Sequence, residues 1–329
     1  MNRDIVVMGG SAGGVEALRR IVADLSPELP ASIFVVVHLS PHADSHLPEI
    51  LSRAGPLPAS HPRDRERIEK GRIYVAPPDM HLLLDRERIR LLRGPRENRH
   101  RPAIDPLFRS AAAAFGPRVV GLVLTGALDD GTAGLIAVKI AGGIAIVQDP
   151  AEAFSADMPR NAMKYLTPDH VVPLAEIAPL LTRLARDSVE PGPYAVPLET
   201  LKEKRLSEFD MAQIESDEKD RPGKPSGFSC PDCGGSLWEL DEPDLLRFRC
   251  RVGHAFAQDN LTAAQAEEVE RALWTALRAL EERAAMSHRV AAHARSRNLS
   301  SLVQPHEKRA AEAEEHAAKL REILLTAAK

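Results

Sequence analysis

Short apolar runs alternate with amphipathic segments over roughly the first 186 residues of the chain. The apolar runs have the length of buried strands, whereas the amphipathic segments repeat apolar residues every three or four positions, as helices do. The predicted strands are Ile5–Met8, Ile33–Val37, Arg72–Ala76, Val119–Thr125, Gly143–Val147 and His170–Val172, and the predicted helices are Gly14–Ala23, Ser45–Arg53, Asp105–Phe115, Thr132–Ala141, Pro159–Tyr165 and Leu174–Arg186. Strands that are apolar on both faces and alternate with helices predict an α/β fold, a doubly wound and mostly parallel sheet in an αβα sandwich.

The pattern changes in three places. His81–Leu92 holds two apolar runs around a short charged centre, which predicts a β-hairpin at a sheet edge. Residues 189–226 are charged and rich in proline, which predicts a linker between a domain at residues 1–188 and the rest of the chain. Residues 259–329 repeat apolar positions at helical spacing and predict a helical hairpin or coiled coil. Self-association through these helices, and a helix pair that packs only on itself, are both open interpretations.

Composition and charge narrow the class of protein. The 329 residues are 44% hydrophobic and 27% charged, which is ordinary for a globular protein with more than one structural unit. The net charge of -4 gives no general attraction to nucleic acid or anionic membranes. The chain starts without an apolar signal segment and has no uncharged run of the length that spans a bilayer. We therefore expect a cytoplasmic protein with no membrane insertion and no nucleic-acid partner.

The most informative motif joins the first predicted strand to the first predicted helix. The chain there reads Gly9-Gly10-Ser11-Ala12-Gly13-Gly14, and the pattern Gly-x-Ser-x-Gly is that of a nucleophile elbow. In such an elbow a sharp strand-to-helix turn raises the serine hydroxyl above the sheet, and the following helix points its free N–H groups back toward it. Ser11 is therefore a candidate nucleophile.

Two other interpretations of this segment are open. A dinucleotide-binding fingerprint would need glycine in place of Ser11 and an acidic residue after the second strand, where the chain has His38. Redox chemistry with a bound nucleotide therefore lacks both of its specific supports. The segment is also consistent with a tight turn that has no chemical role.

A serine hydroxyl needs a base, and the base needs an orienting group. His38 ends the second predicted strand, and Asp129 and Asp130 follow the strand Val119–Thr125. Because the carboxyl ends of strands in a doubly wound sheet line one shared crevice, these side chains can converge on Ser11. The alternative is a packing histidine and two aspartates that cap the helix beginning near Thr132.

Several further motifs follow one another between Met1 and about Leu184. Together with the earlier ones they are the Gly9–Gly14 elbow, the strand end at His38, Ala76-Pro77-Pro78-Asp79-Met80-His81, Arg101-Pro102-Ala103-Ile104-Asp105-Pro106-Leu107-Phe108-Arg109-Ser110, Leu124-Thr125-Gly126 through Asp130-Gly131, Gln148-Asp149-Pro150 and Met158-Pro159-Arg160. In this shared order the motifs resemble the catalytic domain of the chemotaxis protein-glutamate methylesterases.

The resemblance implies an αβα sandwich and a Ser–His–Asp hydrolase that needs no catalytic cofactor. Ser11 matches the nucleophile and His38 the general base, and Asp130 matches the acidic residue because the family's aspartate directly precedes a glycine. The implied reaction is hydrolysis of glutamyl γ-methyl esters on the cytoplasmic helices of chemoreceptors, with deamidation of glutamine as a related activity. Backbone amides near Ala12 and Ala127 would hold the oxyanion. The alternative is an adaptor that keeps the fold without ester cleavage.

The chain departs from the family's pattern at three points. Ala12 stands where the family usually has a hydroxyl residue, and Ala127-Leu128 stands where it usually has Met-Gly. The family also commonly carries an N-terminal phosphoacceptor domain. Since Ser11 lies so near the start of the chain, we expect control by a partner or by the C-terminal region instead. Arg101 and Arg109 are either contacts for an acidic substrate helix or members of ordinary ion pairs.

All three cysteines lie close together at residues 227–258, a segment that predicts a small zinc-knuckle-like module. Cys230 and Cys233 form one pair, Cys250 and His254 form a second, and a Cys₃His set suits structural zinc. A segment this small has little core, so a metal would be needed to order it. Arg247, Arg249 and Arg251 form a basic stripe beside the second pair, which we interpret as a solvated face.

Overall fold

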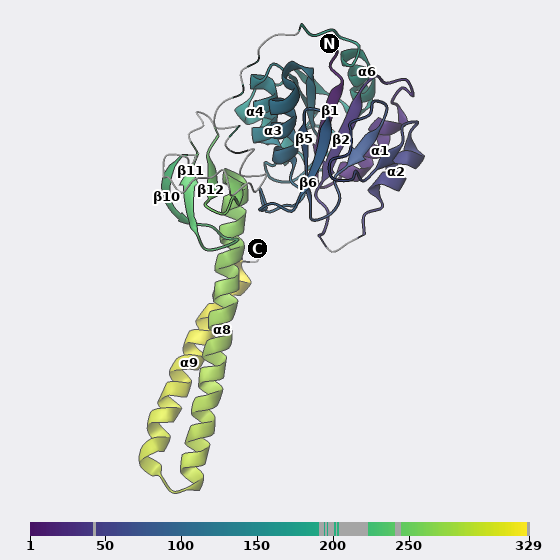
Figure 1. Ribbon diagram of the computed structural model, residues 1–329. Helices are drawn as coiled ribbons and strands as arrows, with labels where there is room; N and C mark the ends of the chain where they lie inside the picture. The colour runs from purple at the N-terminus through teal and green to yellow at the C-terminus, as the bar shows by residue number, and fades with distance from the viewer. Residues whose placement is uncertain are drawn as a thin grey trace. The chain divides into compact units, whose positions relative to one another are not determined.

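The computed structural model describes residues 1–41, 44–190, 194, 196, 201, 203, 223–240 and 245–327 (Figure 1). Most of the predicted linker at 189–226 therefore lies outside the described residues. The chain packs as two compact units, Met1–Leu261 and Thr262–Lys329. All the predicted catalytic and metal-binding residues belong to the first unit.

A seven-stranded sheet forms the centre of the first unit, and every pairing within it is parallel. Its spatial order is β3 (Ala59–Ser60), β4 (Ile73–Val75), β2 (Ser32–Val37), β1 (Ile5–Gly10), β7 (Val119–Val123), β8 (Ile144–Gln148) and β9 (His170–Val172). The order reverses direction beside β1, because β2 lies on one side of it and β7 on the other. Ligand crevices of open α/β sheets form at such a switch point, beyond the carboxyl ends of the strands.

Helices cover both faces of this sheet, so the predicted α/β architecture is confirmed. One face packs against α1 (Gly14–Ala23), α2 (Leu47–Ala54) and α6 (Leu174–Leu184). The other packs against α3 (Ile104–Phe115), α4 (Thr132–Ile140) and α5 (Asp157–Tyr165). Residues of β1 alternate between the two cores, with Val6 and Met8 in the first and Ile5 and Val7 in the second. Figure 1 shows α1 and α2 on the opposite side of β1 from α3 and α4.

The predicted hairpin is present as β5 (His81–Asp85) and β6 (Arg88–Leu92), which pair antiparallel. These strands form a separate two-stranded sheet rather than an edge of the main one. They pack against α3 through Leu82, Leu84 and Ile89. The hairpin thus covers one end of the second core.

A small antiparallel sheet contains the cysteine cluster. Its order is β10 (Lys224–Ser229), β11 (Ser236–Glu239), β12 (Arg247–Cys250) and β13 (Ala255–Ala257). The prediction of a solvated basic face is wrong for two of its three arginines, because Arg247 and Arg249 are each at most 2% exposed. Both arginines are buried because they pair with the carboxylate of Glu203, Arg247 at 2.7 Å and Arg249 at 3.1 Å.

Two long helices, α8 (Gln258–Ser296) and α9 (Ser300–Ala327), contain the rest of the described chain. Within the second unit they run side by side, and Leu277, Ala317 and Leu324 are buried between them (Figure 1). The helical pattern predicted for residues 259–329 is therefore present as a hairpin. In the described part of the chain, no helix combines the length and apolarity that crossing a membrane requires.

Candidate active site

Ser11 occupies the turn between β1 and α1, where the backbone reverses tightly. Gly13 has φ +79°, a left-handed conformation that side chains disfavour, and a Cβ there would lie 2.7 Å from Cβ of Phe154. The Gly14 N–H donates to the carbonyl of Ser11 at 2.8 Å and closes the turn. The glycines of the motif thus serve the geometry that an elbow needs.

The loop after β7 holds the elbow from the side. The Ser11 N–H donates to the carbonyl of Thr125 at 2.9 Å, and the Thr125 hydroxyl donates to the carbonyl of Ala12 at 2.8 Å. A Cβ at Gly126 would lie 2.9 Å from Cβ of Ser11 and 2.0 Å from Sδ of Met158. Only glycine fits there, so the Leu-Thr-Gly motif has a packing reason beside the candidate nucleophile.

His38 bonds to both of its predicted partners. It follows β2 directly, and its Nδ1 lies 3.1 Å from the Ser11 hydroxyl while its Nε2 lies 2.7 Å from Oδ2 of Asp130. An ionised carboxylate only accepts hydrogen bonds, so Nε2 carries the hydrogen and Nδ1 offers its lone pair to the serine. The structure therefore brings together Ser11, His38 and Asp130, which lie far apart in the sequence, in the order that proton transfer requires.

Asp130 is buried but remains ionised because donors surround it. The backbone N–H groups of Ile104 and Gly131 and the side-chain amide of Asn98 donate to its oxygens at 2.7, 3.0 and 2.8 Å. Burial opposes ionisation, but the hydrogen bond and charge of His38 together with these donors hold the pKa of Asp130 below its ordinary value. The carboxylate is thus available to orient His38 and to stabilise its cation.

Asp129 faces a different part of the chain. Its carboxylate accepts hydrogen bonds from the Asp259 N–H at 3.2 Å and from the Asn260 side chain. Burial raises the pKa of Asp129 to about 6. Of the two neighbouring aspartates, only Asp130 reaches His38, and Asp129 caps the first turn of α8 rather than the helix near Thr132.

His100 is a site residue that the sequence analysis missed. Its ring stacks on the ring of His38 with centroids 3.6 Å apart and an angle of 8° between the planes. Burial, and then the neighbouring His38, lower the pKa of His100 to about 3. His100 is therefore an uncharged ring packed against the candidate base. No residue pattern around Glu97-Asn98-Arg99-His100 indicates this role from sequence alone.

Replacing His100 by phenylalanine tests whether the folded protein keeps this imidazole uncharged. The quantity measured is the pH dependence of the free energy of unfolding. Below about pH 6.5 an unfolded chain protonates His100, whereas the folded chain resists protonation until about pH 3, so acid lowers the free energy of unfolding. His100→Phe keeps a flat ring without the titration. From pH 7 to pH 4.5 we expect the variant to lose about 2 kcal/mol less than the wild type in urea unfolding. Equal losses would contradict the buried neutral state.

Two backbone amides near Ser11 are free to bind a developing negative charge. Within the described part of the chain, the N–H groups of Ala12 and Ala127 donate no hydrogen bond, and both residues are exposed. Leu128, at a position where the resembled family usually has glycine, has φ +63°. Its carbonyl accepts a 2.8 Å hydrogen bond from the Asn161 side chain. The loop thus keeps a conformation that glycine would adopt with less strain.

Arg101 and Arg109 form ion pairs within the first unit. Arg101 donates to Asp79, and Arg109, 1% exposed, pairs with Glu97. Arg109 is too deeply buried to meet a substrate helix. For both arginines, the interpretation as intradomain ion pairs is therefore the one that the contacts support.

The four predicted metal ligands lie close together. One candidate ligand atom from each of Cys230, Cys233, Cys250 and His254 falls within 4.8 Å of all the others. The distances between Sγ of Cys233 and Cys250 (3.8 Å), and from Nδ1 of His254 to Sγ of Cys250 (3.5 Å) and Cys230 (3.7 Å), are those of adjacent ligands. Zinc bonds of about 2.3 Å to sulfur and 2.1 Å to nitrogen give tetrahedral edges of about 3.8 and 3.6 Å. The cluster therefore fits a tetrahedral ion.

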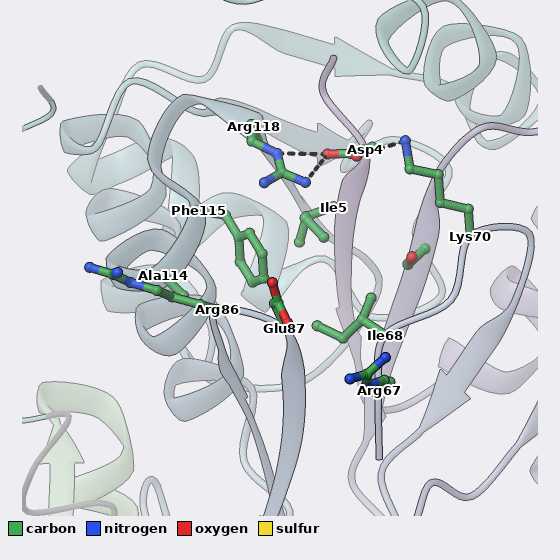
Figure 2. Close-up of a pocket in the computed structure, with 11 residues that line it drawn as sticks. Asp4, Ile5, Arg67, Ile68, Lys70, Arg86, Glu87, Ala114, Phe115 and Arg118 are labelled. Carbon is green, nitrogen blue, oxygen red and sulfur yellow. Dashed lines mark hydrogen bonds and ion pairs between the residues drawn. The ribbon is translucent and has the colours of Figure 1, made fainter. Parts of the chain in front are cut away.

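A cavity of about 550 Å³ lies elsewhere, beside the amino ends of β1 and β2. Figure 2 shows Arg118 and Lys70 both reaching Asp4 at its rim, with ion pairs of 2.8 and 2.9 Å. Ser11 follows the opposite, carboxyl end of β1. The cavity is therefore separate from the Ser11–His38–Asp130 cluster, and Asp4, one of its two acidic lining residues, is already paired.

The first half of the chain is similar in sequence to known proteins. A sequence model described as CheB methylesterase matches residues 6–181. The chain is 37% identical to a putative protein-glutamate methylesterase/protein-glutamine glutaminase of Leptospira interrogans, over 58% of this chain and 99% of that protein. It is also 37% identical to protein-glutamate methylesterase/protein-glutamine glutaminase 3 of Burkholderia lata, over 55% of this chain and 51% of that protein.

A solved structure gives the same result for the fold. The crystal structure of the Thermotoga maritima CheB methylesterase catalytic domain superimposes with a TM-score of 0.54 at 32% identity, and covers 55% of this chain and 98% of that one. The family match ends at residue 181, so the cysteine cluster and the long helices lie beyond it.

Proposed function

The chain belongs to the CheB methylesterase family, and on that premise we propose that it hydrolyses glutamyl γ-methyl esters of chemoreceptors as a Ser–His–Asp hydrolase. The observation that carries the proposal is the pair of hydrogen bonds made by His38, one to the Ser11 hydroxyl and one to Asp130. The adaptor alternative is not favoured, because a chain without catalysis has no need of this geometry.

In the proposed first step, Nδ1 of His38 takes the proton of Ser11 as the hydroxyl oxygen attacks the ester carbonyl. Asp130, held ionised, keeps the second nitrogen protonated and stabilises the imidazolium that forms. The N–H groups of Ala12 and Ala127 would hold the oxyanion, each worth roughly 3 kcal/mol in the transition state. The imidazolium then protonates the leaving oxygen, and methanol departs from an acyl-enzyme on Ser11.

In the second step His38 takes a proton from water, and the resulting hydroxide attacks the acyl carbonyl. Collapse of the tetrahedral intermediate returns the proton to Ser11 and releases a glutamate carboxylate. The same sequence acting on a glutamine side chain releases ammonia in place of methanol. Glutamine deamidation on the receptors' cytoplasmic helices is therefore part of the proposal, and it uses the same residues.

The substrate is tested by measuring methanol released from methylated receptor cytoplasmic fragments by the full-length protein. Fragments whose glutamates carry no ester are the control, and fragments with glutamine at the same positions are assayed for ammonia. We expect methanol in proportion to the ester content. Absence of both products from folded protein would contradict the proposed activity.

We propose further that Cys230, Cys233, Cys250 and His254 hold a structural zinc ion. The ligand distances are the support, together with the chemistry of a Cys₃His set, which uses all four positions and leaves none open for a substrate. The ion would fix the turn that carries Cys230 and Cys233 against the turn that carries Cys250 and His254.

Metal content tests this proposal directly. Reduced full-length protein is expected to contain about one zinc ion per chain. Cys233→Ala removes an exposed ligand without opening the core, so the variant is expected to lose most of its zinc and to unfold the small sheet at a lower temperature. Ser236→Ala, a neighbouring exposed change, is the matched control and should keep the metal. Equal zinc content in wild type and Cys233→Ala would contradict the assignment.

A further inference from the structure

Asn98 links the small sheet to the candidate active site. The Asn98 amide donates to Oδ1 of Asp130 at 2.8 Å and to Oδ2 of Asp105 at 2.9 Å. Its carbonyl oxygen accepts the N–H of Ala257 in β13 at 2.8 Å, and its backbone N–H donates to the carbonyl of Ala255 at 2.7 Å. Asn98, which is only 2% exposed, therefore connects β13 to Asp130.

The orientation of this amide follows from its partners. The ionised Asp130 carboxylate can only accept from an amide nitrogen, and the Ala257 N–H can only donate to an amide oxygen. A flipped Asn98 would lose both of these hydrogen bonds. The position of β13 thus determines whether an N–H of Asn98 points at Asp130.

The position of β13 is in turn tied to the cysteine cluster, because Ala255 directly follows the candidate ligand His254. Buried ion pairs hold the neighbouring strand as well. Arg249 of β12 pairs with Glu97 at 3.0 Å and with Glu203 at 3.1 Å, and all three side chains are at most 3% exposed. Glu97 is adjacent to Asn98, so the same contacts that hold β12 hold Asn98.

A second group of contacts reaches the same loop from the chain just after β13. Asp259 and Asn260, in the first turn of α8, bond to Asp129, the residue before Asp130. Asn161 donates both to the carbonyl of Leu128 and to the carboxylate of Asp259. Residues 255–260 therefore contact Asp130 through Asn98 and hold the loop that carries it.

We propose that the cysteine-cluster module is a positioning element of the catalytic site, and that Asn98 is the positioning residue through which it orients Asp130. This inference rests on the proposed hydrolase function. Loss of the metal would loosen β13, release Asn98 and leave Asp130 with one donor fewer and a less fixed orientation toward His38. The substrate-binding surface itself would not change, so the expected loss is in kcat rather than in KM.

The test uses the full-length chain and replaces Asn98 by glycine. Asn98 has φ +49°, which glycine adopts freely, so Asn98→Gly removes the side chain without backbone strain. Asn298→Gly is the matched control, since Asn298 is exposed, has φ +57° and lies between α8 and α9. A charge-assisted hydrogen bond is worth a rate factor of about 10 to 100, and we expect Asn98→Gly to lower kcat by that factor with KM unchanged within about 2-fold.

Coupling between Asn98 and the metal cluster is measured by combining variants. If the module acts through Asn98, Cys233→Ala lowers kcat by a similar factor, and the double variant is no slower than the slower single variant by more than about 2-fold. Multiplied losses in the double variant would overturn the proposal, as would wild-type kcat in Asn98→Gly.

A second measurement depends neither on the receptor nor on the folding of a variant. A fluorophosphonate phosphonylates an activated serine, with fluoride as the leaving group. Its rate of reaction with Ser11 is followed in wild-type protein before chelation, after chelation and after zinc is returned. We expect chelation to lower this rate by about 10-fold or more and returned zinc to restore it. Amide exchange in the metal-free protein should quicken only around residues 97–100, 128–130 and 230–260. An unchanged rate in protein shown to be metal-free would overturn the proposal.

The outcomes separate this inference from the proposed function. If Ser11 reacts and slows on metal loss but receptor fragments yield no methanol or ammonia, the substrate is wrong and the positioning role stands. If receptor hydrolysis occurs and metal loss or Asn98→Gly leaves it unchanged, the positioning role is wrong and the function stands. An unreactive Ser11 in folded, metal-loaded protein would contradict both.

Discussion

Ser11→Ala is expected to reduce methanol release from methylated receptor fragments by at least about 10⁴-fold. The hydroxyl is the only group in the cluster that can form the acyl-enzyme, and His38 alone would have to direct water at the ester. Within the described residues, this hydroxyl bonds to Nδ1 of His38 at 3.1 Å, so its loss should lower the free energy of unfolding by no more than about 1 kcal/mol.

Activity and stability are measured on the same protein to separate the two effects. Steady-state methanol release gives kcat, and thermal unfolding followed by circular dichroism shows that the fold is kept. Ser301→Ala, an exposed serine in α9, is the control and should match the wild type in both. Hydrolysis by Ser11→Ala within about 10-fold of the wild-type rate would mean that the nucleophile is another residue.

The second large effect is expected from Asp130→Asn, which should lower kcat by about 10⁴-fold. Each carboxylate oxygen of Asp130 accepts from donors: Oδ2 from His38 and Ile104, and Oδ1 from Asn98 and Gly131. An asparagine must place its NH₂ on one of these sides. If the NH₂ faces Nε2 of His38, the imidazole hydrogen moves to Nδ1 and the ring no longer accepts the serine proton.

The opposite orientation of the new amide is disfavoured because its NH₂ would meet the Asn98 side chain and the Gly131 N–H. Either way a buried donor loses its acceptor. Asp187→Asn, at an exposed aspartate, is the control. Methanol release and fluorophosphonate labelling of Ser11 should fall together in Asp130→Asn. A loss smaller than about 10-fold in both would show that this carboxylate does not set the tautomer of His38.

The parallel sheet and most of its helices could be predicted from sequence because its central strands, such as β1 and β7, are buried on both faces and are apolar runs. β3 could not, since its two residues, Ala59 and Ser60, are too short to show a pattern. The convergence of Ser11, His38 and the aspartates also follows from the topology, because strand ends of a parallel sheet share one edge. The choice of Asp130 over Asp129 needed the family resemblance.

The remaining site residues depend on contacts between distant parts of the chain. Asn98 and His100 lie in a loop where no periodic pattern marks them, and only the folded chain brings them to Asp130 and His38. Arg249 looks like a surface residue because arginine usually is one. Its burial depends on Glu97, far earlier in the chain, and on Glu203, within the segment predicted as a linker.

Exposed and buried ion pairs in this chain differ in how strongly dissolved salt weakens them. Along α8 and α9 the pairs, such as Arg278 with Glu282, are exposed, and counterions at physiological ionic strength weaken them readily. The pair of Arg249 with Glu97 is closed to water, so counterions cannot reach it without opening the protein. An increase in salt concentration that weakens the ion pairs of the α8–α9 hairpin would therefore leave Arg249 paired with Glu97, next to Asn98. The small sheet and the helical hairpin can thus respond separately to ionic strength.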